Sequence, residues 1–257
     1  MSLIRLYQAM ALSLDQTVCL DEKASHHLAR VLRARVGDEL VVFNGQGDEY
    51  LVVIVQLHKK NVEVKLAERR QPLVEPPVNV CLAQGIARGE KMDFIIQKAV
   101  ELGVTQIIPL ITERSNVRLN QERQAGRLQH WRAVLQSACE QSGRHRPPEM
   151  TSPERFDTWL QAVTGDLCFV LSPHVNNRLP AQVLPAGAKV VLLIGPEGGL
   201  SQHEMAQAVM KGFMPLNLGP RVLRTETASL AALSILQYCY GDMGQINSMF
   251  RGRANDV

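Results

Sequence analysis

Five polar residues near the C-terminus have types that could bind or act on a ligand. They precede a run of small and apolar residues that begins at Ala228, within the segment LGPRVLRTETASLAALSI (218–235). The run predicts a helix that is buried on all sides. Guanidiniums can hold an anion and a carboxylate can accept a proton, whereas hydroxyls and acids also cap helices. Capping does not explain two arginines, so we predict a ligand site here and keep capping as the alternative. The five residues are Arg221, Arg224, Thr225, Glu226 and Thr227.

A glycine-rich loop lies earlier in the chain, in KVVLLIGPEGGLSQHE (189–204). An apolar strand is expected to run into GPEGG, and Ser201 and Glu204 have the spacing of a capping box at the start of a helix. Ligands bind at such strand-to-helix loops in open α/β sheets, and glycines let the backbone approach them. The loop matches neither a P-loop nor a dinucleotide fingerprint, and Glu197 would repel a pyrophosphate. We therefore predict a ligand with hydroxyls, an amine or a cationic centre, with a structural turn as the alternative.

A third loop, LSPH (171–174), also follows a predicted strand. Three loops at the ends of neighbouring strands can line one pocket.

The elements that must position these loops fall into two groups, separated by the proline-rich segment QPLVEPP (71–77). Short β-branched runs before it predict three strands, and one helix precedes them. We expect a small β-barrel over residues 1–72, with strands at 40–43, 50–57 and 61–66 and a helix at 23–33.

After the boundary, strands and helices alternate, which indicates an α/β domain with a parallel sheet over residues 73–243. The last residues, 244–257, are polar and predict a loose tail. We expect strands at 78–83, 107–111, 167–171, 189–194 and 214–218, and helices at 91–102, 121–141, 201–211 and 228–240.

Composition is that of an ordinary globular protein, with 46% hydrophobic and 21% charged residues among 257. No apolar run reaches the length of a membrane span, and the N-terminus lacks a signal-peptide layout, so we expect a cytoplasmic protein. The five cysteines form no C-x-x-C pair, and the adjacent His26 and His27 would point apart. No metal site is therefore expected.

Positive charge is concentrated in two stretches, although the net charge is only +3. Residues 113–146 hold seven arginines against three glutamates, and residues 1–37 hold five basic residues against three acids. This distribution indicates a polyanion partner, and a solvated helix face is the alternative.

The two C-terminal motifs together resemble the signature of the SPOUT methyltransferases, namely IGPEGG (194–199) and LGPRVLRTETA (218–228). Four further segments narrow the resemblance to the RsmE family of 16S rRNA uracil-N3-methyltransferases, over residues 3–243. They are SHHLARVLR (25–33), ARGEKMDFIIQKAVELGV (87–104), TERS (112–115) and ACEQSGRHRPPE (138–149).

The resemblance implies a C-terminal α/β domain tied in a trefoil knot that binds S-adenosylmethionine, with a PUA-like β-barrel before it. It also implies a cofactor site formed by Leu171, Ser172, Pro173, Ile194, Gly195, Pro196, Glu197, Gly198, Gly199, Leu218, Gly219, Val222, Leu223, Arg224, Thr225, Thr227 and Ala228.

For the reaction, the resemblance implies methylation of N3 of a uridine in 16S rRNA by a homodimer. Arg144 and Arg224 would stabilise negative charge on the uracil, and Glu226 is a conceivable proton acceptor, with a capping or arginine-pairing carboxylate as its alternative. The residues expected to contact RNA, each with a surface ion pair as its alternative, are Arg5, Arg30, Arg33, Arg88, Lys91, Lys98 and Arg144.

Three rival functions differ in class. The first is methylation of another RNA or atom, such as a ribose hydroxyl, against which the barrel and the EQSGR segment (140–144) argue. The second is RNA binding without catalysis, against which the complete loops argue. The third, a nucleotide-dependent oxidoreductase, lacks its fingerprint.

Overall fold

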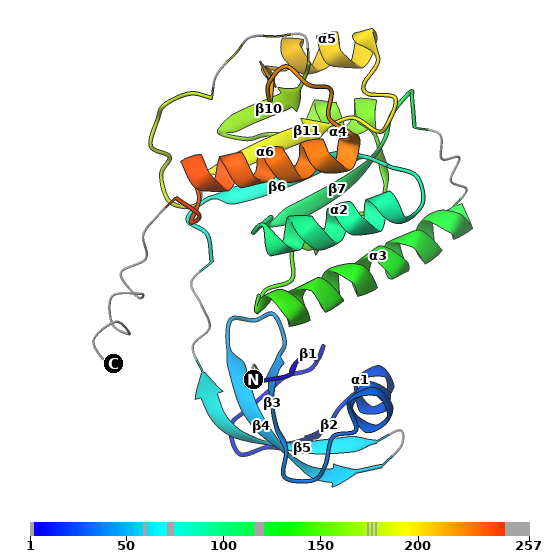
Figure 1. Cartoon of the computed structure of the whole chain (residues 1–257), viewed down its shortest axis with the longest axis vertical. Coiled ribbons are helices and arrows are strands. Elements are labelled where there is room, and N and C mark those ends of the chain that lie inside the picture. The colour runs from blue at the N-terminus through cyan, green and yellow to red at the C-terminus, as the bar shows by residue number, and fades with distance from the viewer. Residues whose placement is uncertain are drawn as a thin grey trace. The chain divides into compact units, whose positions relative to one another are not determined.

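The computed structural model describes residues 3–58, 61–70, 75–115, 121–173, 175, 177 and 179–244, without the side chains of 121–123 (Figure 1). Three predicted features lie wholly or partly outside this range. They are the domain boundary, at residues 71–74, the third loop, at His174, and the tail, at residues 245–257. The chain divides into two compact units. One holds Met1–Val74 with Gln136–Pro147, and the other holds Glu75–Leu135 with Pro148–Val257.

The first unit is built on a five-stranded sheet in the order β1-β3-β4-β5-β2. Alternate side chains of its strands, such as Val62, Val64 and Leu66, are buried in one apolar core together with Leu28 of the helical segment. Two of its strands have three residues each and were not predicted from the sequence. The bounds are β1 Arg5–Tyr7, β2 Thr17–Cys19, β3 Glu39–Phe43, β4 Glu49–Leu57 and β5 Val62–Arg70.

The predicted helix at 23–33 consists of two parts. The helix α1 spans Glu22–His26 and the π-helix η1 spans His27–Leu32. Asp21 caps the start by accepting a hydrogen bond from the N–H of Ala24 at 2.7 Å. Arg33 ends the segment in the left-handed conformation, with φ of 53°.

The second unit is an α/β domain with a parallel sheet in the order β12-β10-β11-β6-β7-β8, with β9 also paired to β7. Every described pair in it is parallel, as the alternating pattern predicts. The strands are β6 Asn79–Gly85, β7 Gln106–Ile111, β8 Glu149–Met150, β9 Glu154–Arg155, β10 Leu167–Leu171, β11 Lys189–Ile194 and β12 Met214–Leu216.

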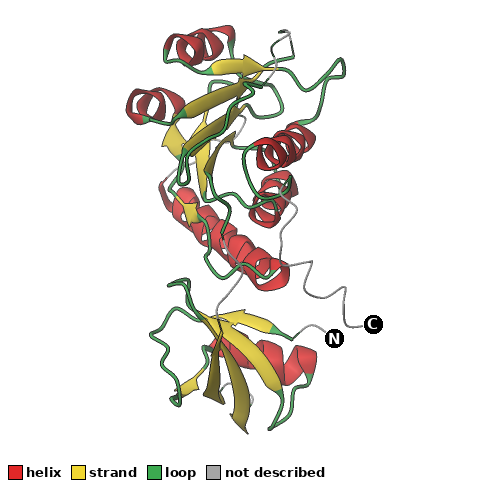
Figure 2. Cartoon of the chain, turned by 90° about the vertical axis from the view of Figure 1, so that its left-hand side faces the viewer, coloured by secondary structure: helices red, strands yellow, loops and turns green. Residues whose placement is uncertain are grey.

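Helices cover both faces of this sheet, seen nearly edge-on in Figure 2. α4 and α5 pack together on one face, over a core that includes Trp159 and Phe213, and α2 and α6 pack together on the other. The short α4 was not predicted. The bounds are α2 Glu90–Glu101, α3 Gln121–Ser142, α4 Phe156–Ala162, α5 Gln202–Met210 and α6 Thr225–Cys239.

The prediction for the last helix was wrong in two respects. α6 begins at Thr225 rather than Ala228, and it is not buried on all sides, because Ile235 and Tyr238 are exposed. Its buried positions, including Ser229, Leu233 and Leu236, follow the spacing of a single helix face. Small and apolar residues on the other face made the wheel look uniformly buried.

Candidate functional site

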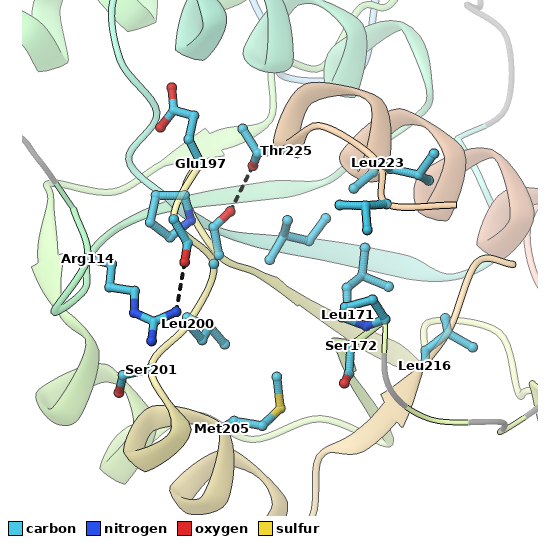
Figure 3. A pocket seen from close by; sticks show the side chains of 18 of the residues that line it. Arg114, Leu171, Ser172, Glu197, Leu200, Ser201, Met205, Leu216, Leu223 and Thr225 are labelled. Atoms are coloured by element: carbon cyan, nitrogen blue, oxygen red, sulfur yellow. Dashed lines mark hydrogen bonds between the residues drawn. The ribbon is translucent and has the colours of Figure 1, made fainter. Parts of the chain in front are cut away.

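A pocket of about 1000 Å³ lies in the second unit, at the carboxyl ends of β10, β11 and β12. Ligands bind at this edge of a parallel sheet because the strand-to-helix loops gather there. Figure 3 shows apolar side chains from several elements around the pocket, among them Leu171, Leu200 and Met205. All three predicted loops contribute to its wall.

The glycine loop needs its glycines because backbone packs directly on backbone. A Cβ at Gly195 would lie 2.7 Å from the carbonyl carbon of Gly199 and from the nitrogen of Leu200. A Cβ at Gly85, at the end of β6, would lie 2.5 Å from Cδ of Pro196. Both distances are shorter than Cβ contacts allow, so the loop is folded tightly on itself and against the end of β6.

Hydrogen bonds at the start of α5 fix the residues that directly follow this loop. Ser201 and Glu204 form the predicted capping box, in which Ser201 Oγ accepts from the N–H of Glu204 at 3.1 Å. The buried carboxylate of Glu204 accepts from the N–H of Ser201 and, through its second oxygen, from the N–H of Glu113 at 2.9 Å. It thereby ties the residues after β7 to α5.

Arg114 is a wall residue that was not assigned to the site from the sequence. Its Nη1 donates to the carbonyl oxygen of Gly198 at 2.9 Å, so the guanidinium braces the glycine loop from the β7 side (Figure 3). The only sequence signal was its place in the quoted TERS segment. Other wall residues outside the predicted set include Leu200, Met205, Leu216 and Asn217.

The entry to α6 is held by hydrogen bonds rather than by a side-chain cap. Arg224 occupies the N-cap position and no side chain caps the helix there, so capping does not account for the threonines. Thr225 Oγ1 instead donates to the carbonyl oxygen of Gly195 at 2.7 Å (Figure 3). The first residue of α6 and the glycine loop are therefore directly joined.

A charged cluster lies at one side of the pocket. Lys91 Nζ is 3.7 Å from Glu197 Oε1 and 3.7 Å from Glu226 Oε2. Burial raises the pKa of Glu197, but hydrogen bonds from the N–H groups of Arg88 and of Glu197 itself, with the charges of Lys91 and Arg88, lower it overall. Glu197 is therefore ionised at neutral pH, and its carboxylate points away from Leu200 and Met205 (Figure 3).

Most of the residues predicted for the cofactor line this one pocket, and Gly219 and Thr227 are the two that do not. Of the residues predicted for catalysis, Arg224 lines the pocket, Glu226 adjoins it through Lys91, and Arg144 belongs to the other unit. The roles of all of these residues stay predictions.

The residues predicted to contact RNA differ in their availability. Arg30, Arg33 and Arg88 are exposed, and Lys91 lines the pocket. Lys98 Nζ is paired with Glu101 at 2.7 Å, which fits the surface ion pair that was its alternative.

Arg5 is less available for the expected contact with RNA, because its side chain is mostly buried and one guanidinium nitrogen is already paired. Nη1 lies 2.6 Å from Glu49 Oε2, and the side chain is only 16% exposed. The guanidinium also lies over the ring of Phe43, 5.2 Å from its centroid.

Comparison with known proteins identifies the family. The RNA methyltransferase domain family matches residues 74–237, and the RNA methyltransferase PUA domain family matches residues 20–67. A ribosomal RNA small subunit methyltransferase E from Buchnera aphidicola is 35% identical, over 93% of this chain and 97% of its own. The chain belongs to the ribosomal RNA small subunit methyltransferase E family. A relative of the same name from Bacillus subtilis is 31% identical over 83% of this chain and 86% of its own.

Solved structures agree with this assignment. A methyltransferase from Legionella pneumophila, in complex with the cofactor SAM, has a TM-score of 0.90 and 39% identity, and the match covers 95% of this chain and all of that one. A ribosomal RNA small subunit methyltransferase E from Neisseria gonorrhoeae, bound to S-adenosyl methionine, has a TM-score of 0.87 and 37% identity over 94% of this chain and all of that one. This chain therefore has a small N-terminal PUA-type domain and a C-terminal methyltransferase domain with a parallel sheet.

Proposed function

We propose that this protein transfers a methyl group from S-adenosylmethionine to N3 of one uridine in 16S rRNA, giving 3-methyluridine. The observation that carries the proposal is the pocket formed by the glycine loop and the segment before α6, in a chain similar over almost its whole length to methyltransferases with that cofactor bound.

The pocket fits this cofactor in size and in chemistry. Its volume of about 1000 Å³ lies in the range of small-molecule sites, which combine apolar walls with a few polar groups. Leu171, Leu216 and Leu223 offer an apolar surface for an adenine ring, and the loop at 195–199 offers backbone N–H and C=O groups. Bound S-adenosylmethionine would supply a methyl group that is already activated on a sulfonium.

The protein's own residues must stabilise the uracil as it loses its N3 proton. N3 carries a proton whose loss leaves negative charge on the ring carbonyl oxygens, and a fixed cation lowers the energy of that charge. We propose that Arg224 is this cation, since it lines the pocket and has no ion-pair partner among the described residues. Arg144 is proposed for the same task. N3 lies on the pairing edge, so the base must be unpaired or flipped out.

Glu226 is better explained as a paired carboxylate than as the proton acceptor. Its Oε2 is buried, makes no hydrogen bond, and has Lys91 within ion-pair distance. We expect Glu226→Gln to lower kcat by less than about tenfold, well below the effect typical of a general base. Single-turnover methyl transfer at saturating cofactor measures this. A loss of about 100-fold or more, with the cofactor Kd unchanged, would instead assign the base to Glu226.

We propose that Arg30 and Arg33, exposed on η1 and at its end, contact phosphates of the substrate RNA. Replacing both with alanine should reduce the salt slope of log K by about 1.4, or about 0.7 for each single-stranded phosphate contact. Lys98→Ala is the matched control, because Glu101 already pairs with that lysine. Titration of labelled 16S rRNA over a range of salt concentrations measures the slopes. Equal slopes for the double variant and the control would contradict the assignment.

We further propose the trefoil knot, the homodimer and a cytoplasmic location implied by the family resemblance. The dimer is supported by exposed apolar residues on two helices that pack together, Phe94 on α2 and Ile235 and Tyr238 on α6. Light scattering should give twice the mass of one chain, and Tyr238→Arg should shift the mass toward that of a monomer. A wild-type monomer at all concentrations would contradict the dimer.

No described helix is long and apolar enough to cross a membrane.

Transfer of labelled methyl from S-adenosylmethionine to small ribosomal subunits that lack the modification tests the function directly. Naked 16S rRNA serves as the parallel substrate. We expect label in the assembled subunit and little in naked rRNA. Binding of the cofactor without label in either substrate would leave the fold and pocket intact and overturn the substrate.

A further inference from the structure

Gln84 is a buried side chain at the end of β6 that touches both loops of the pocket. Its side chain has no exposed surface. Nε2 lies 3.3 Å from the carbonyl oxygen of Gly195 and 3.1 Å from Thr225 Oγ1, and it also donates to the carbonyl oxygen of Gly85 at 3.0 Å. Oε1 accepts from Ser229 Oγ at 2.7 Å.

The amide can make these contacts in one orientation only. Two backbone carbonyl oxygens and the Thr225 hydroxyl oxygen surround the NH₂ group and share its two protons. The Ser229 hydroxyl faces the amide oxygen and also lies 2.8 Å from the carbonyl oxygen of Thr225. A flipped amide would place its oxygen against the carbonyl oxygen of Gly195. A buried polar group left without its partner is unfavourable, so the network holds one arrangement of its members.

The Thr225 hydroxyl donates its one proton inside this network. It donates to the carbonyl oxygen of Gly195 and accepts from Gln84, so it has no proton left for a ligand, and these bonds fix the backbone around it. The bonds connect three elements that are far apart in sequence, namely β6, the loop after β11 and the first turn of α6. Thr225 by itself joins the glycine loop to α6, and Gln84, which is not among the predicted site residues, adds the hydrogen bonds from β6 to both.

We propose that Gln84 is a positioning residue, which holds the glycine loop and the start of α6 in the arrangement that forms the cofactor pocket. Without it, the two loops sample arrangements that do not bind, and apparent affinity falls in proportion to the competent fraction. The part of this inference that concerns affinity rests on the proposed function, whereas the part that concerns loop order does not.

The chain offers a matched control for this residue. Gln237 is also fully buried, and its Nε2 donates to one backbone carbonyl oxygen, that of Gly103, at 3.1 Å. It lies in α6 but does not line the pocket. Gln84→Met and Gln237→Met therefore remove the same group from equally buried positions, and only the first touches the pocket loops.

Amide hydrogen exchange of the ligand-free chain and calorimetric titration with S-adenosylmethionine test the proposal. Gln84→Met should speed exchange in residues 195–200 and raise the Kd about 10- to 100-fold, as expected for several lost hydrogen bonds. Gln237→Met should leave exchange of that loop and the Kd within about twofold, since it removes no pocket contact. Equal effects of the two variants on loop exchange would overturn the proposal.

A second variant tests the same link if Gln84→Met folds poorly. Thr225→Val removes the other member of the pair, and the double variant should weaken binding by clearly less than the product of the two single effects. Purely additive effects would overturn the link. If the wild-type chain binds no S-adenosylmethionine while Gln84→Met still speeds loop exchange, the proposed function fails and the positioning role stands.

Discussion

Gly195→Ala is expected to weaken S-adenosylmethionine binding by about 100-fold or more, while the domain still folds. The added Cβ would lie 2.7 Å from backbone atoms of Gly199 and Leu200, and 2.9 Å from Gly199 Cα. These atoms are main chain and cannot rotate away, so the loop must open. Because Thr225 and Gln84 both bond to the Gly195 carbonyl oxygen, that shift also disturbs the start of α6. Calorimetric titration measures the change.

The control for this variant is Gly126→Ala in α3, where an added Cβ meets nothing within 4 Å. Alanine in a helix is more favourable than glycine by about 0.8–1 kcal/mol, so this variant should be as stable as the parent or more so, with unchanged binding. Tight cofactor binding by Gly195→Ala would show that the glycine loop does not form the site.

Arg224→Met is expected to lower kcat by about 100- to 1000-fold, the loss seen when a fixed group that stabilises developing charge is removed. Arg224 lines the pocket directly before Thr225, whose hydroxyl is held by Gly195 and Gln84. The backbone that carries the exposed guanidinium is thereby fixed, which restricts the positions that the guanidinium can reach beside the pocket. Single-turnover methyl transfer at saturating S-adenosylmethionine measures the effect.

Arg221→Met provides the comparison, since Arg221 also lines the pocket and is exposed, but lies three residues farther from the anchored threonine. Its loss should change kcat by less than about threefold, because Arg221, unlike the equally exposed Arg224, does not adjoin the anchored Thr225. If the two variants lose activity equally, or if Arg224→Met raises the cofactor Kd and leaves kcat unchanged, Arg224 binds the cofactor rather than the uracil.

The long elements of the fold could be predicted from sequence because their signals are local. The strands β10 and β11 match their predicted bounds, since each is a continuous apolar run of the kind that a doubly covered parallel sheet requires. The three-residue strands β1 and β2 are too short to show a period, and pairing with distant strands decides them. The assignment of residues 136–147 to the first unit likewise depends on tertiary contacts.

The pocket wall could be predicted in part for a related reason. Glycine, proline and a change of hydrophobic period mark loops such as 195–199 in the sequence, and parallel strands bring such loops to one edge. Arg114 and Gln84 carry no such mark. Gln84 sits near the end of a mostly apolar strand, and its importance comes from which atoms surround it after folding.

The identity of the modified nucleoside tests the proposed reaction most directly. Small ribosomal subunits with unmodified 16S rRNA are incubated with the protein and S-adenosylmethionine, and the rRNA is digested and analysed by mass spectrometry. We expect 3-methyluridine at a single position, formed by the wild-type chain and not by Gly195→Ala. A methyl group on a ribose hydroxyl or on another base, or no methylated nucleoside, would contradict it.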